Sequence, residues 1–97
     1  MTIAKEQTGS TLTVTLDGRL DTITSPDLEQ SLTDLTGITH LVLDFTKINY
    51  VSSAGLRVLL ALQKTMARQG DMVVRNVDQM VMEVLEMSGF VDILTIE

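Results

Sequence analysis

The sequence predicts a single α/β domain, in which a mixed β-sheet of an N-terminal hairpin plus parallel strands packs against about three helices. The chain has 97 residues, 44% of them apolar, which suits one domain with one aliphatic core. Residues 11–16 alternate threonine with aliphatic side chains, as is typical of a strand with one buried face. Short apolar runs then alternate with helix-length segments, a pattern typical of parallel strands joined by right-handed crossovers.

The N-terminal residues predict an antiparallel hairpin. Residues 2–7 form the expected first strand, residues 8–10 the turn and residues 11–16 the second strand. The hairpin therefore precedes the first helix and adds an antiparallel element to the sheet.

The first helix is predicted to begin at Ser25 and to end at Gly37. Ser25 is a favourable N-cap, Pro26 suits the first helical position, and Asp27 suits the positive end of the helix dipole. The apolar stripe of this helix consists of Leu28, Leu32 and Leu35.

The second half of the chain repeats strand and helix. The predicted elements are a strand at 41–43, a helix at 53–69 closed by Gly70, a strand at 72–74, a helix from 76 to 89 and an edge strand at 93–96. The strand residues expected to be buried are Leu41, Val42, Leu43 and Val73.

The third helix is predicted from a capping pattern and a packed face. Asn76 with Gln79 resembles a capping box, and Phe90 is expected to pack back on Leu85 after Gly89. The expected packed face holds Val77, Val81, Val84, Leu85 and Ser88, with Met80 at its edge and Met82 on the opposite side.

The composition excludes several classes of function. Without cysteine there is no thiol chemistry, and the single histidine, His40, cannot build a two-histidine metal site. No glycine-rich phosphate loop is present, and a net charge of −6 repels nucleic acid and anionic lipid. We therefore expect no cofactor, no metal and no nucleic acid. Because no basic and apolar leader and no apolar run of about 20 residues occurs, we expect a cytoplasmic protein that does not insert into a membrane.

Two adjacent serines, Ser52 and Ser53, lie where the third strand turns into the long helix. Serine is a favoured helix cap, and two hydroxyls at the positive end of a helix can also carry chemistry; both interpretations stay open at this point. The sequence argues against a serine hydrolase, because His40 would lie about 16 Å from Ser53 along the strand before the connecting loop is counted. The Gly-x-Ser-x-Gly pattern also fails, since position 51 is valine.

The long helix carries a basic stripe. Arg57, Lys64 and Arg68 lie within about 40° of one another around the helix axis, and Ser53 heads the same stripe. The stripe is either an ordinary solvated face or a surface for an acidic partner.

Three segments resemble the STAS domain of the anti-sigma factor antagonist type. Leu43–Leu60, with Ser52-Ser53-Ala54-Gly55-Leu56 at its centre, resembles the family's strand, loop and helix. Leu16–Asp21 is similar to its Gly-x-Leu-Asp segment, and Met87–Phe90 is similar to its late turn. The resemblance covers residues 1–97, which it implies form one STAS domain.

The resemblance implies a switch in bacterial transcription control rather than an enzyme. Family members bind an anti-sigma factor that is also a serine kinase, release it when phosphorylated, and are reset by a PP2C-type phosphatase. Matched by position, the phosphorylated residue is Ser53, with Ser52 as second choice because it replaces a family aspartate. The implied partner-binding residues are Asp21, Ser52, Ser53, Gly55, Arg57 and Lys64.

Two alternatives remain. The chain is also similar to STAS subunits that dock other proteins without phosphorylation, in stress-signalling assemblies or on the ATPase of a lipid transporter. From another class, a small nucleotide-binding or nucleotide-hydrolysing enzyme would need a phosphate loop and a basic cleft, both of which this sequence lacks.

Overall fold

Five strands and three α-helices follow one another in the predicted order, in a computed structural model that describes residues 1–97. The strands are β1 (Thr2–Thr8), β2 (Thr11–Leu20), β3 (His40–Val51), β4 (Asp71–Arg75) and β5 (Thr95–Ile96). The helices are α1 (Ser25–Ser31), α2 (Ser53–Ala67) and α3 (Gln79–Met87), followed by the short 3-10 helix η1 (Phe90–Asp92). Among these helices, none combines the length and apolar character that crossing a membrane requires.

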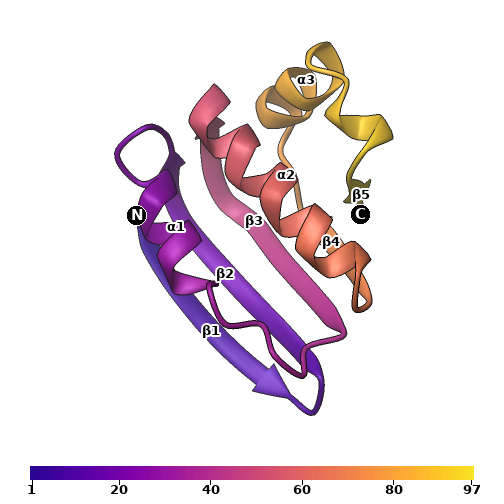
Figure 1. Cartoon of the computed structure of the whole chain (residues 1–97). Coiled ribbons are helices and arrows are strands. Elements are labelled where there is room, and N and C mark those ends of the chain that lie inside the picture. The colour runs from indigo at the N-terminus through magenta and orange to yellow at the C-terminus, as the bar shows by residue number, and fades with distance from the viewer.

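The strands form one mixed sheet in the order β1-β2-β3-β4-β5 (Figure 1). β1 pairs with β2 antiparallel, and every later pair is parallel. The predicted fold class, an N-terminal hairpin plus parallel strands, is therefore confirmed. Because the β2–β3, β3–β4 and β4–β5 connections each run through a helix, the carboxyl ends of the three central strands meet at one end of the sheet.

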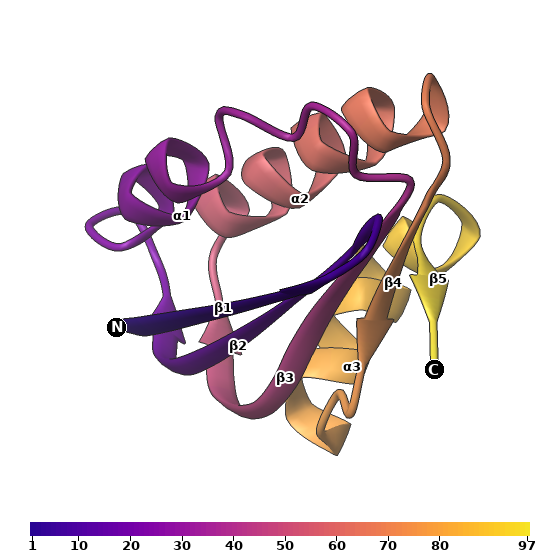
Figure 2. The same cartoon turned by 90° about the horizontal axis from the view of Figure 1, so that it is seen from below.

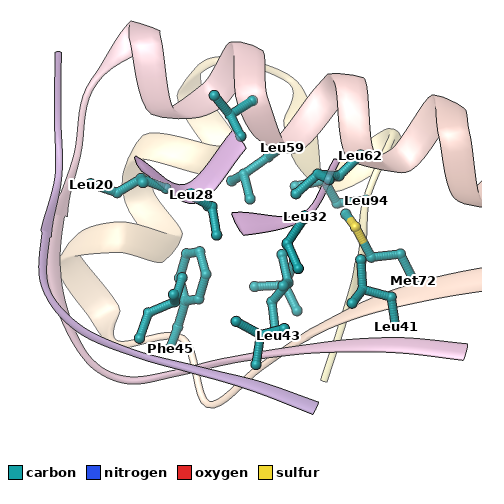
Figure 3. Packing of buried hydrophobic residues seen from close by; sticks show 14 of the residues in the cluster. Leu20, Leu28, Leu32, Leu41, Leu43, Phe45, Leu59, Leu62, Met72 and Leu94 are labelled. Carbon is teal, nitrogen blue, oxygen red and sulfur yellow. The ribbon is translucent and has the colours of Figure 1, made fainter. Parts of the chain in front are cut away.

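One aliphatic core lies between the sheet and the helices. Figure 2 shows α1 and α2 together on one side of the sheet, and Figure 3 shows their leucines meeting Leu41, Leu43 and Phe45 of β3. α3 contacts β3 and adds Val81 and Leu85 to the same core. The burial predicted for Leu41, Val42, Leu43 and Val73 is confirmed.

α1 is shorter than predicted. It ends at Ser31, with Leu32 as C-cap, and not at Gly37. Leu35 is still buried, but on an irregular segment. The prediction that Ser25 caps α1 is wrong: Thr24 occupies the N-cap position, and the buried Ser25 hydroxyl has no hydrogen-bond partner.

α3 starts later than predicted, so its capping pattern was misplaced. Asp78 is the N-cap and accepts a hydrogen bond from the Val81 N–H at 2.8 Å. Asn76 instead has a positive φ of 61° in the turn after β4. Val84, predicted on the packed face, is exposed, whereas Met82 on the opposite side is partly buried.

β3 is longer than its continuous apolar run, and the last strand is shorter. β3 extends over 12 residues to Val51 because Phe45, Ile48 and Val51 continue to bury their side chains beyond residues 41–43. β5 covers only Thr95–Ile96.

Candidate functional site

The two serines at the end of β3 have different environments. Ser52 is the N-cap of α2, and its hydroxyl oxygen accepts a hydrogen bond from the Gly55 N–H at 3.4 Å. Its backbone N–H donates to the Leu20 carbonyl at 2.9 Å, which joins the turn to the end of β2. Ser53, by contrast, is exposed, and its hydroxyl makes no hydrogen bond within the chain. Ser52 therefore fills the cap, and the Ser53 hydroxyl is free for another role.

Gly55 allows α2 to approach the end of β2. A Cβ at this position would lie 2.8 Å from Leu20 Cγ and 2.9 Å from the Leu20 carbonyl oxygen. Both distances are too short for any larger residue without a backbone shift. Gly55 is buried, so its part in the site is to hold the start of α2 against the loop that follows β2.

Asp21 organises that loop, which joins β2 to α1. Its Oδ1 accepts hydrogen bonds from the backbone N–H groups of Ile23 and Thr24, both at 3.0 Å. The Thr24 N–H is the main cause that lowers the pKa of the Asp21 carboxyl below its usual value of 3.8, and Arg19 adds a smaller effect in the same direction. Asp21 thus shapes the loop from within, and its Oδ2 lies 3.7 Å from Arg19 Nε.

Three residues of this end of the molecule were missed by the sequence analysis. The loop held by Asp21 presents Ile23 with 82% of its surface exposed. The Arg19 guanidinium lies 4.2 Å from the centroid of the Tyr50 ring, a cation–π contact between β2 and β3. The signal that could have found Tyr50 is that it is the only tyrosine and lies two residues before Ser52. Ile23 carried no such signal, since a loop isoleucine is buried or exposed according to tertiary structure alone.

The basic stripe of α2 is exposed. Arg57, Lys64 and Arg68 are all exposed, and none forms an ion pair within the chain. Arg57 also borders a hollow of about 200 Å³ between α1 and α2, next to the Ser53 turn. The residues lining this hollow are Thr22, Ser25, Pro26, Glu29, Ala54, Arg57 and Val58.

His40 lies away from Ser53. It opens β3, whereas Ser53 follows the end of that 12-residue strand. The His40 Nδ1 atom pairs with Asp71 on the neighbouring β4. No group of three or more histidine, aspartate or glutamate side chains is arranged to hold a metal ion.

The geometry thus defines a small α/β domain that exposes a serine where its central parallel strand enters a helix, beside an ordered loop and a basic helix face. The sequence matches the profile of the family described as STAS domain over residues 2–97. The chain belongs to the STAS domain family.

Relatives and solved structures agree with this assignment. BtrV of Bordetella bronchiseptica, assigned by name to the anti-sigma factor antagonists, is 32% identical over 99 residues, which cover 99% of this chain and 85% of BtrV. The unphosphorylated form of the anti-sigma factor antagonist SpoIIAA superposes with a TM-score of 0.84 at 19% identity, over 99% of this chain and 88% of that one. The phosphorylated form of the Bacillus cell fate determinant SpoIIAA gives 0.76 at 18% identity, over 99% and 91%.

Proposed function

We propose that this protein is an anti-sigma factor antagonist whose binding is switched by phosphorylation of Ser53. Unphosphorylated, it binds an anti-sigma factor that is also a serine kinase; phosphorylated, it releases this partner, and a PP2C-type phosphatase restores the binding form. The relatives named as anti-sigma factor antagonists support the general role. The observation that carries the switch is the exposed Ser53 hydroxyl, which has no structural task beside the capping Ser52.

The start of α2 can accept a phosphate without unfolding. A phosphate adds roughly −1.5 to −2 charges and three acceptor oxygens. No acidic residue lies in the first turn of α2, the N–H groups there lie at the positive end of the helix dipole, and Arg57 follows one turn later. In an interface, however, the same charge is costly to bury. Phosphorylation would thus break the complex while leaving the domain folded.

Ser52 fills the capping position that an aspartate holds in the family pattern. Serine and aspartate are both favoured N-caps, so the turn keeps its hydrogen bond to the Gly55 N–H. What the replacement removes is a negative charge next to Ser53. We therefore infer that the kinase of this protein tolerates a neutral residue before the phosphorylated serine.

The proposed partner surface surrounds the turn. It comprises the organised loop with Asp21 and exposed Ile23, the turn with Ser52, Ser53 and the buried Gly55 beneath it, and the α2 face with Arg57 and Lys64. Ile23 supplies an apolar contact, and the hollow beside Arg57 can receive a partner side chain.

Phosphate mapping tests the proposal. With the cognate kinase and ATP, we expect one phosphate at Ser53, none on Ser53→Ala, and slower modification of Ser52→Ala because its turn is less ordered. Thr65→Ala, a matched change of an exposed hydroxyl on the same helix, should be modified like the wild type. A phosphate on Ser52 or on a threonine would contradict the site. Absence of any modification would favour a STAS subunit that docks without phosphorylation in a stress-signalling or lipid-transport ATPase complex.

A binding titration tests the consequence of the charge. Ser53→Asp should weaken binding to the kinase, whereas its circular dichroism spectrum should match that of the wild type, because exposed substitutions usually change stability by less than about 0.5 kcal/mol. Wild-type affinity in this variant would show that a negative charge at Ser53 does not control release.

A further inference from the structure

α3 and the residues after it expose an apolar surface that lies outside the proposed partner surface around Ser53. Met80 and Met87 are 70% and 90% exposed, and Val84 between them is also exposed. At 100° per residue these three side chains lie within about 60° of one another, so they form one stripe along α3. η1 packs against α3, and Val91 in η1 and Ile93 directly after it are exposed. These five residues are called the α3 patch below. Figure 1 shows the chain from α3 onward in yellow, at the end of the colour scale.

The stripe is distinct from the face that holds α3 to the core. Val81 and Leu85 are fully buried and anchor the helix, while the stripe of Met80, Val84 and Met87 is centred about 110° away around the helix axis. Exposed apolar side chains gathered on one helix face are unusual on a monomeric protein and mark interaction sites. Methionine suits such a site because its flexible thioether chain adapts to partners of different shape.

The charged residues in the segment that carries the α3 patch are all acidic. Residues 76–97 contain five of the thirteen acidic residues and none of the seven lysines and arginines. Three of these acids, Glu83, Glu86 and Asp92, are exposed and form no ion pair. An apolar stripe beside unpaired carboxylates complements a segment that is apolar on one side and basic on the other.

This charge pattern favours one kind of binding partner for the α3 patch. A second copy of the chain would bring the same carboxylates against each other, and an anionic membrane surface would be repelled in the same way. A helical peptide with an apolar stripe flanked by lysine or arginine satisfies both features of the patch, with helix lying on helix.

We propose that the α3 patch is a second docking surface, which binds a basic amphipathic helix of another protein. It lies on different elements from the Ser53 turn, so the protein can hold such a helix whatever the phosphorylation state of Ser53. The proposal does not depend on the switch proposed above.

A labelled peptide tests the proposal. The probe is an 18-residue helix with leucine at one face and lysine elsewhere, titrated by fluorescence anisotropy against the full chain. We expect saturable binding that weakens with salt, and resonance shifts in the protein confined to residues 79–93. A Met80→Ser/Met87→Ser double variant should bind about tenfold more weakly, a loss of about 1.4 kcal/mol.

Matched controls separate this surface from general attraction to an acidic protein. Ile23→Ser removes an equally exposed apolar side chain elsewhere and should leave the affinity unchanged, as should Ser53→Asp. Glu83→Gln/Glu86→Gln should lower both the affinity and its salt dependence. A peptide with glutamate in place of lysine should not bind. Equal binding of the two peptides, wild-type affinity in the methionine variant, or self-association of the chain through Met87 in place of peptide binding would overturn the proposal.

Discussion

At the scale of single residues, neighbouring side chains of the same type lie in different environments. Ser52 and Ser53 cannot be told apart by residue type, and both capping and signalling fit the sequence. The hydrogen bond from the Gly55 N–H assigns the cap to Ser52, and the exposure of Ser53 leaves its hydroxyl free. Which serine caps depends on the residue at which β3 ends, and a strand end is the feature that sequence patterns locate least well. The position of the turn was predictable, and the family resemblance favoured Ser53 for phosphorylation, but residue type alone did not show which serine caps the helix.

The Asp21 carboxyl predicts how the loop between β2 and α1 responds to pH. Its pKa is lowered, chiefly by the Thr24 N–H, so the folded loop is stabilised above the usual value of 3.8 and loses this stabilisation as the pH falls through the lower, folded pKa. An NMR titration of the Ile23 and Thr24 amides should therefore show a midpoint below 3.8.

Two variants test whether the Asp21 carboxylate is the group whose protonation changes the loop. Asp21→Asn keeps an acceptor oxygen without the charge, so its loop amides should change little with acid. Asp17→Asn, at an exposed acid nearby, should titrate like the wild type. A midpoint at or above 3.8 for the wild-type loop would contradict the assignment of these hydrogen bonds.

At the scale of elements, the existence and type of each α-helix and strand followed from sequence, while several ends and the short helix η1 did not. The end of α1 is the clearest case. Gly37 has the positive φ of 80° expected of a helix-terminating glycine, yet α1 stops at Ser31. The segment after Ser31 is held in its non-helical course by the Gln69 side chain, far along the chain, which donates to the carbonyl oxygens of Leu35 and Ile38 at 2.7 and 2.6 Å. No local pattern reveals a contact across more than 30 residues.

Gly70 belongs to the same junction. A Cβ there would lie 1.8 Å from the Thr39 carbonyl oxygen, so the start of β4 passes directly against the start of β3. The prediction that Gly70 closes α2 is wrong: α2 ends at Ala67 with Arg68 as its C-cap, and Gly70 lacks the positive φ of a helix-terminating glycine. The close approach to Thr39 is the reason for a glycine at this position.

Gln69→Ala tests whether this junction stabilises the domain. Because two carbonyls lose their donor, we expect the free energy of unfolding to fall by about 1–2 kcal/mol, measured by urea denaturation. Gln79→Ala removes a glutamine whose side chain makes one exposed hydrogen bond, of 3.4 Å to Glu83, and should cost far less. Equal stability of the two variants would mean that Gln69 does not hold the segment after α1.

At the scale of the whole molecule, charge is distributed unevenly. The fold itself was predictable from the order of strands and helices. The net charge of −6 correctly describes the average, but the basic groups of α2 lie apart from the acidic last 22 residues. Helical spacing predicted the basic stripe of α2. The α3 patch was not predicted, because the same spacing placed Val84 on the packed side, and the true orientation depends on how α3 contacts β3.

This uneven distribution allows a test in which net charge is held constant. Arg57→Glu and Arg68→Glu change the total charge equally, but Arg57 lies one turn from Ser53, whereas Arg68 lies at the far end of α2, about 22 Å away. If the partner contacts the start of α2, Arg57→Glu should slow association with the proposed kinase partner and alter its salt dependence much more than Arg68→Glu does.

Lys64 lies between the two arginines on α2, so a variant at this position tests whether the effect falls with distance from Ser53. Lys64→Glu should have an intermediate effect, because steering by an exposed charge falls with its distance from the interface over about 10 Å at moderate salt. Association rates measured by stopped flow at two salt concentrations give the order of the three variants. Equal slowing by all three would mean that only net charge attracts the partner. In that case α2 is an ordinary solvated face, and the partner contacts the Ser53 turn from the side of the Asp21 loop.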